Sequence, residues 1–310
     1  LGANVPPLGL SNKPLYEGES EQAKEPAKKK DDYDTGPAPL PITHSTPPLE
    51  EHLLQSTLWP EIMKLYGHPN EIAALACNNK GNLLASACKG SQPEESSLRL
   101  WNTTTWKEVA KIGAHKLTAV QLEFSSNDQF LLSVSRDRTF CVTKVVQNPD
   151  GTVEAEIVAK VKAHERIVWC GGWSCDDNFV ATGSRDKAIK VWQRADEQCK
   201  EWKAVSTITF GAPVTALTWA TKPVTSIQNS QYRYVIAVGL ENGLISFINA
   251  DSPKTPTSWT ALYNFNPLHC HADTVKKLQW RQGEEGQKEQ QIQLASCSTD
   301  NSVRLFSVQF

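Results

Sequence analysis

The sequence predicts an all-β protein built from repeated units of short strands, and three observations lead to this prediction. From Trp59 onward, apolar runs of four to seven residues alternate with Gly, Asn, Asp and Ser, which is the composition of strands joined by turns. No stretch sustains the 3.6-residue period of an amphipathic helix. One arrangement of runs and turns also recurs along the chain, which is the pattern of a repeat architecture.

Each repeated unit opens with a small residue followed by histidine. A first apolar run, a polar turn, a second run, an acidic turn and a third run come next. The histidines are His68, His115, His164 and His271, and Phe210-Gly211 takes their place in the fourth unit. The acidic residues, six positions before the end of the third runs, are Glu95, Asp137, Asp186, Glu241 and Asp300. The spacing of roughly 42 to 60 residues fits four-stranded propeller blades with loop insertions.

The first element is the segment 1–58, which we expect to be a largely disordered linker or insertion. Proline, lysine and acidic residues dominate it, as in EGESEQAKEPAKKKDDYD, and such a composition has little to bury. The run Lys28-Lys29-Lys30 is flanked by acids, which favours a solvated linker over a nucleic-acid or nuclear-import patch. The chain does not start with Met, and we expect it to be a fragment of a longer one.

The later elements are five blades, expected at about 59–102, 110–147, 158–193, 203–248 and 265–310. The first has the runs LLASA and SLRLW, the latter ending at Trp101, and the second has FLLSVS and TFCVT. The third is the most complete, with FVATGS and AIKVW ending at Trp192. The fourth has LISFI, and the fifth has LASCS and SVRLF.

The third unit raises the question of whether His164 and Asp186 form a catalytic pair or a structural one. A catalytic pair occurs once in a chain, whereas this pair recurs as His115 with Asp137 and His271 with Asp300. A buried aspartate needs partners, and histidine and tryptophan N–H groups can supply them. The repetition therefore favours a structural fastener of each blade.

These motifs resemble the WD-repeat family of β-propellers over residues 59 to 310. The resemblance implies that a histidine, a hydroxyl of the second strand, an aspartate and a tryptophan form one hydrogen-bonded network. In the third unit these are His164, Thr182 or Ser184, Asp186 and Trp192. Partial sets are His68 with Trp101, His115 with Asp137, and His271 with Asp300. The Trp-Asp dipeptide that gives the family its name is absent from all units.

Longer segments are more specific. PPLEEHLLQSTLWPEIMKLYGH at 47–68, RLWNTTTWKEV at 99–109, FLLSVSRDRTF at 130–140 and WCGGWSCDDNFVATGSRDKAIKVW at 169–192 resemble the family of the second subunit of the Elongator complex, in its C-terminal half. This family is built from two seven-bladed propellers, so five units imply further blades.

This resemblance implies a non-catalytic scaffold that holds the large subunit and the catalytic subunit together. The complex modifies the wobble uridine of transfer RNA with a carboxymethyl-type group, and any contact of this chain with tRNA is expected to be indirect. Two alternatives stay open: a propeller that contacts tRNA phosphates through a basic face, and an adaptor in signalling or transcription elongation. The expected location is both cytoplasmic and nuclear.

Composition and motifs exclude several other functions. The net charge is −2 and no run of 18 apolar residues exists, so we expect neither general attraction to nucleic acid nor a membrane partner. No phosphate loop, GxSxG or HExxH motif is present, and we expect no catalytic residues, cofactor or small-molecule substrate. His269-Cys270-His271 lacks a second ligand pair, so no metal site is expected. The eight scattered cysteines are expected to be free thiols in a reducing compartment.

A basic face is the candidate partner-binding surface. Turns between the second and third strands of a propeller meet on one face, and here we expect them to carry arginine and lysine. Trp169 and Lys276 follow the histidines of their units and should emerge nearby. Arginine and tryptophan are enriched at binding hot spots. The predicted face comprises Arg136, Arg138, Trp169, Arg185, Lys187, Lys276 and Arg304, and the alternatives are solvated turn tips and phosphate contacts.

Overall fold

The computed structural model describes residues 63–148, 152–220, 224–225, 231–232, 234–250, 259–281 and 292–308. The chain divides into two compact units, Leu1–Tyr66 and Gly67–Phe310, and the strands of the described residues lie in the second. The predicted linker at 1–58 lies outside the described residues.

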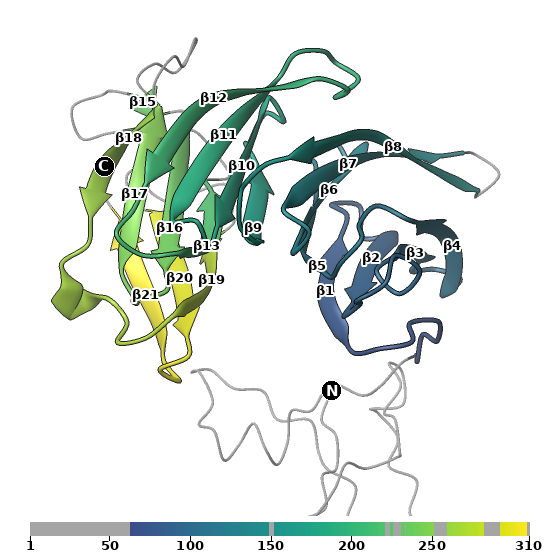
Figure 1. Ribbon diagram of the computed structural model, residues 1–310, viewed down its shortest axis with the longest axis horizontal. Helices are drawn as coiled ribbons and strands as arrows, with labels where there is room; N and C mark the ends of the chain where they lie inside the picture. Colours follow the sequence, from purple (N-terminus) through teal and green to yellow (C-terminus); the bar gives the residue numbers. More distant parts are fainter. Residues whose placement is uncertain are drawn as a thin grey trace, which may run out of the picture. The chain divides into compact units, whose positions relative to one another are not determined.

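The predicted all-β propeller fold is confirmed, with five antiparallel sheets arranged as successive blades (Figure 1). The first blade is β1 Ile72–Cys77, β2 Leu83–Cys88, β3 Leu98–Asn102 and β4 Lys107–Ile112. The second is β5 Ala119–Phe124, β6 Phe130–Ser135, β7 Thr139–Gln147 and β8 Val153–Lys162. The third is β9 Val168–Trp173, β10 Phe179–Ser184, β11 Ala188–Arg194 and β12 Trp202–Thr209.

The last two blades carry the insertions. The fourth is β13 Val214–Trp219, β16 Val235–Leu240, β17 Ile245–Ala250 and β18 Trp259–Asn264. A separate two-stranded pair, β14 Val224–Thr225 and β15 Gln231–Tyr232, lies between β13 and β16 in the sequence. The fifth has three described strands, β19 Val275–Trp280, β20 Ile292–Ser298 and β21 Val303–Val308. A 3-10 turn, η1 Pro267–His269, is the one helical element of the described chain.

The fourth strands β4, β8 and β12 come directly or within one residue before the dipeptide that opens the next sequence unit, and β18 comes before Cys270-His271 with η1 between them. For example, β4 precedes Ala114-His115, and β8 precedes Ala163-His164. A sequence unit and a structural blade are therefore offset by one strand. This offset places His115, His164 and His271 at junctions between two blades.

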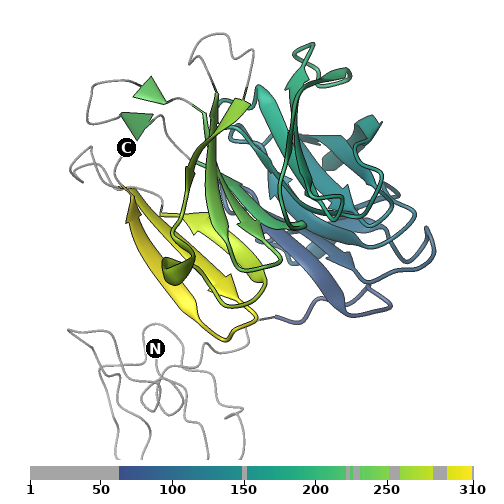
Figure 2. The same ribbon diagram turned by 60° about the vertical axis from the view of Figure 1, so that its left-hand side comes forward.

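The blades pack face to face through apolar cores, and their first strands contact one another in the order β1, β5, β9, β13, β19. Between the second and third blades, the rings of Phe140 and Trp192 lie 5.3 Å apart. Between the fourth and fifth, Phe247 stacks on Trp280 at 5.5 Å, and Figure 2 shows these two blades, green and yellow, side by side. Burial of aromatic faces of this kind dominates core energetics.

Glycine in the second strands permits this close packing. A Cβ on Gly183 of β10 would lie 2.5 Å from Val214 of the next blade, and one on Gly239 of β16 would lie 2.6 Å from Val275. Any larger residue would push the blades apart. In the described part of the chain, no helix is long and apolar enough to cross a membrane.

Candidate partner-binding face and the network beneath it

The histidine of the third blade lies at the centre of a buried hydrogen-bonded network. His164 Nδ1 is 3.0 Å from Asp186 Oδ2, and His164 Nε2 is 2.9 Å from Thr182 Oγ1. The Trp192 indole N–H donates to the same Thr182 hydroxyl at 2.9 Å. With the aspartate accepting from Nδ1–H, Nε2 is left as the acceptor of the threonine proton. Thr182 thus joins the histidine to the tryptophan.

Of the two hydroxyls considered from the sequence, Ser184 has a different place. Its Oγ donates to the Ile167 carbonyl at 2.8 Å and accepts the Asp186 amide at 3.2 Å. Ser184 therefore fixes the turn that carries Asp186 but touches neither His164 nor Trp192. Ser184 is the last residue of β10, so the amides of the following turn are the donors nearest to its hydroxyl.

Blades two and five repeat the network without its tryptophan. His115 lies 3.3 Å from Asp137 and 2.8 Å from Ser133 Oγ, and His271 lies 3.1 Å from Asp300 and 2.6 Å from Ser296 Oγ. In the second blade Thr143 stands where Trp192 stands in the third. Its buried hydroxyl has no hydrogen-bond partner.

The first blade keeps the other half of the network. Ser86 Oγ lies 2.7 Å from His68 Nε2 and accepts the Trp101 N–H at 2.7 Å. Glu95, which the spacing put in the aspartate slot, instead accepts from the Ser91 amide at 3.0 Å. His68 Nδ1 is consequently buried without a partner, because the insertion before Glu95 carries the carboxylate away.

The network shifts the pKa values of its ionisable groups. Burial alone would raise the pKa of Asp137, but hydrogen bonds from His115, Thr139 and the Lys116 amide outweigh it and hold the pKa well below its ordinary value. Hydrogen bonding by Ser302 likewise lowers the pKa of Asp300. Burial lowers the pKa of His164 despite the opposing charge of Asp186. The fold thus favours ionised aspartates and, in the third blade, a neutral imidazole.

The basic turn residues of the predicted face are exposed. Arg136 and Arg138 flank Asp137 between β6 and β7, and Arg185 and Lys187 flank Asp186 between β10 and β11. Arg138 and Lys187 have φ of 71° and 68°, a left-handed conformation that costs free energy in residues with a Cβ. The residue after the aspartate therefore has the same backbone conformation in both turns.

Arg304 was wrongly expected at a turn tip. It lies within β21, and its Nη1 donates to the His269 carbonyl at 3.2 Å. Lys190 of β11 makes the corresponding contact in the third blade, from Nζ to the Ala163 carbonyl at 2.8 Å. Arg304 therefore supports the loop before its own blade's histidine and is half-buried.

Trp169 and Lys276 share a backbone feature that the sequence did not reveal. In every blade the first strand has a β-bulge at its second residue, where the register skips one position. A bulge turns the side chain of the extra residue away from the regular alternation. The five bulge residues are Ala73, Val120, Trp169, Thr215 and Lys276.

Four bulge residues line one cavity of about 380 Å³, here called the mouth cavity. Val120, Trp169, Thr215 and Lys276 contribute to its wall together with the turn residues Arg185 and Glu241. Three residues of the predicted face, Trp169, Arg185 and Lys276, therefore meet at one place. Arg136, Arg138 and Lys187 do not line the mouth cavity.

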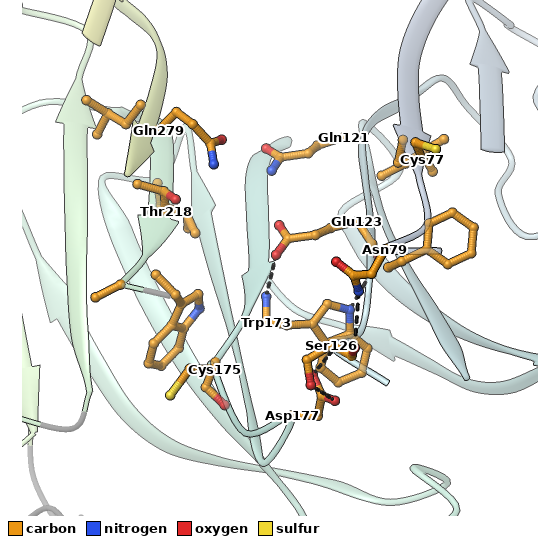
Figure 3. Close-up of a pocket in the computed structure, with 18 of the residues that line it drawn as sticks. Cys77, Asn79, Gln121, Glu123, Ser126, Trp173, Cys175, Asp177, Thr218 and Gln279 are labelled. Carbon is orange, nitrogen blue, oxygen red and sulfur yellow. Dashed lines mark hydrogen bonds between the residues drawn. The ribbon is translucent and has the colours of Figure 1, made fainter. Parts of the chain in front are cut away.

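A second cavity of about 650 Å³, the channel cavity, lies between the first strands of all five blades. Gln121, Glu123, Thr218 and Gln279 project into it (Figure 3). Burial raises the pKa of Glu123 to about 7, against the effects of the Trp173 amide and Lys277. Gln121, Leu217 and Lys277 line both cavities, so the two adjoin.

Tryptophans at the ends of the first strands tie the third, fourth and fifth blades each to the preceding blade. The indole N–H of Trp173 donates to the Glu123 carbonyl at 3.2 Å, that of Trp219 to Gly172 at 2.9 Å, and that of Trp280 to Thr218 at 3.4 Å. The sequence signal was the aromatic residue that closes each of these runs; Phe124 takes this place in the second blade. These residues were assigned no role from the sequence, so the ties were not predicted.

Aspartates add further ties beyond these strand ends. Asp128 accepts the Asn79 and Lys80 amides at 2.7 and 3.1 Å, and Asp177 accepts the Ser126 amide and hydroxyl at 2.8 and 2.6 Å. Each holds the turn of the preceding blade. Across the described residues, no group of three His, Cys, Asp or Glu side chains could hold a metal ion.

Comparison with known proteins agrees with the architecture. The model of the family "WD domain, G-beta repeat" matches residues 59–102, 106–144 and 155–193. Elongator complex protein 2 of Arabidopsis thaliana is 38% identical over 322 residues, covering 100% of this chain and 37% of the relative. Its counterpart in Homo sapiens is 37% identical over 334 residues, covering 99% and 40%. That of Schizosaccharomyces pombe is 33% identical over 311 residues, covering 99% and 38%. The chain thus spans about two fifths of the length of these relatives.

Proposed function

The chain is a WD40-repeat β-propeller homologous along its whole length to Elongator complex protein 2, and from this premise we propose that it serves as a non-catalytic scaffold of an Elongator complex. The observation that carries the proposal is that the match extends over the whole of this chain. The recurring histidine networks support it, since groups that recur in four of the five units are fasteners rather than one reaction centre.

The scaffold would join the large subunit of the complex to its catalytic subunit. Through them it would be required for the carboxymethyl-type modification of wobble uridine in transfer RNA. The exposed turns with Arg136, Arg138 and Arg185 offer the interface, because arginine is enriched at binding hot spots. The free state of the eight cysteines supports action in reducing compartments, the cytoplasm and the nucleus.

A second candidate function is direct contact with tRNA phosphates. The same exposed arginines favour it, since phosphate contacts depend on Lys and Arg. Under this alternative, affinity for tRNA would fall steeply with salt and would vanish on charge reversal. The net charge of −2 opposes it, because the attraction would depend on this one face.

The test is affinity purification of the protein from cells with Arg136, Arg138 and Arg185 all changed to glutamate. A matched control reverses the charge of exposed lysines on β4, β7 and β12: Lys107, Lys144 and Lys203. Joint loss of the large and catalytic subunits and of wobble-uridine modification, in the first variant only, supports the scaffold. An intact complex with lost modification supports the tRNA alternative. Normal assembly and modification in both variants would reject this face as an interface.

A further inference from the structure

We propose that the mouth cavity is a binding site for an acidic, extended peptide segment of a partner protein, with a carboxylate held between Arg185 and Lys276 and apolar atoms resting on Trp169. The identity of the partner as an Elongator subunit rests on the proposed function, but the chemistry of the site does not. Nothing in the histidine networks or the blade ties requires these three side chains.

The backbone makes the site. Because the bulge falls at the second residue of every first strand, consecutive blades present their bulge side chains side by side at one end of the channel. Blades two to five supply Val120, Trp169, Thr215 and Lys276 to one wall. Bulges often re-aim side chains beside binding and active sites. The four bulge residues of the wall are therefore carried by strands, which hold them more firmly than loops would.

The charges of the cavity call for an anion. Among the described residues, neither the Arg185 guanidinium nor the Lys276 ammonium has a hydrogen bond or ion pair. By contrast, Lys160 and Lys190 donate to the carbonyls of Ala114 and Ala163 at 2.7 and 2.8 Å. Cations not used by the fold are available to a carboxylate, and Arg can bind one through two parallel hydrogen bonds.

Trp169 supplies the apolar part of the site. It is half-buried and lies in the same wall as the two cations. Tryptophan in this position gives a large contact area at little entropic cost, and such residues dominate interfaces. An occupant that combines a carboxylate with neighbouring aliphatic atoms, such as a Glu or Asp within an extended strand, matches both features.

Two observations favour a peptide over RNA. The cavity, at about 380 Å³, fits a few side chains and is not a basic groove that could follow a sugar-phosphate backbone. Glu241 lies in its wall and would repel a polyanion. A single carboxylate can stay at the Arg185 and Lys276 side of the wall.

The experiment places a photo-crosslinking p-benzoylphenylalanine at Val120 in the protein within its native complex, followed by sequencing of the cross-linked material. We expect a peptide with a net negative charge. A synthetic, fluorescein-labelled copy of that peptide should bind the wild-type chain, and Arg185→Glu with Lys276→Glu should weaken binding at least 100-fold. Trp169→Ala should weaken it about tenfold. The paired control Lys144→Glu with Lys203→Glu carries the same charge change and should bind normally.

Several outcomes would overturn the site. These are cross-linking to RNA, cross-linking to a neutral or basic peptide, no cross-link from an assembled complex, or equal binding of the labelled peptide by both charge-reversal variants. Failure of the proposed function looks different. In that case the wild-type chain would co-purify with no Elongator subunit, while an acidic peptide from another protein could still be cross-linked at Val120 and lose affinity in the Arg185 and Lys276 variant.

Discussion

One threonine hydroxyl, that of Thr182, satisfies two buried groups in the third blade, whereas the buried hydroxyl of Thr143 satisfies none. We expect Thr182→Val to lower the free energy of unfolding by about 2 kcal/mol, because it leaves the Trp192 N–H without a partner and His164 Nε2 with only the Thr182 carbonyl at 3.2 Å. The control Thr143→Val should be neutral or stabilising by up to about 1 kcal/mol. Urea midpoints of the two variants would measure the difference, and equal effects would show that Thr182 adds nothing to the network.

Glu123, which lines the channel cavity, is expected to make the stability of the fold depend on pH. Its folded pKa of about 7 lies above the unfolded value of about 4.5. At low pH the carboxyl is neutral in both states, and as pH rises from 4.5 through 7 its ionisation in the unfolded chain lowers the free energy of unfolding. We expect Glu123→Gln to change little at pH 4.5 and to raise the free energy of unfolding by about 2 kcal/mol at pH 8. Urea unfolding at the two pH values tests this, and a pH-independent difference would contradict it.

At this scale the sequence predicted residue types better than contacts. The recurrence of His115, His164 and His271 with an aspartate was visible because sequence spacing alone reveals it. The sequence could not decide between Thr182 and Ser184, because both residues lie in the run FVATGS. Only the three-dimensional structure shows which hydroxyl reaches the imidazole. Arg304 was misplaced although the spacing carried the signal: it lies four residues after Asp300, as Lys190 lies four residues after Asp186, and so falls inside the run that forms β21.

At the scale of elements, the blades are coupled by tryptophan N–H groups that each reach the preceding blade. We expect Trp219→Phe to lower the free energy of unfolding by about 1–2 kcal/mol, because the Gly172 carbonyl loses its buried donor. The same exchange at Trp169, whose indole nitrogen has no hydrogen bond among the described residues, is the control and should stay within about 0.5 kcal/mol. Thermal unfolding would compare them, and similar losses would mean that ring size rather than the hydrogen bond matters.

Strand order and blade number followed from the sequence, but the bulges and ties did not. The sequence of a single strand does not reveal a bulge here, because the five bulge residues have no side-chain type in common: they are Ala73, Val120, Trp169, Thr215 and Lys276. The bulge becomes visible only when each first strand is paired with its neighbour. The tryptophans that end these runs, Trp173, Trp219 and Trp280, were visible in the sequence. Which carbonyl of the preceding blade each indole N–H reaches depends on how the blades pack, and this the sequence does not show.

At the scale of the whole molecule, ties at successive interfaces predict that the described blades open together. The buried thiols report this: Cys88, Cys141, Cys170, Cys199 and Cys270 are buried, and Cys77 is exposed. Burial raises the pKa of both Cys141 and Cys170 to about 12, so these thiols resist reaction while folded.

In labelling with a thiol reagent across a urea series, we expect Cys77 to react first under native conditions. The five buried cysteines should then become reactive in one transition, since each blade is held by its neighbour. Labelling of each cysteine, followed by mass spectrometry, provides the measurement. Separate midpoints for Cys88 and Cys199 would instead mean that the blades behave as independent repeats.

The shared bulge also bears on how such a molecule can change over evolutionary time. Five blades hold one backbone irregularity with five different side chains, from alanine to tryptophan. The conformation there is set by the neighbouring pairs of the ladder and tolerates almost any side chain. A lineage could therefore exchange these residues one at a time and alter what the protein recognises, while the fold and its stability stay as they were.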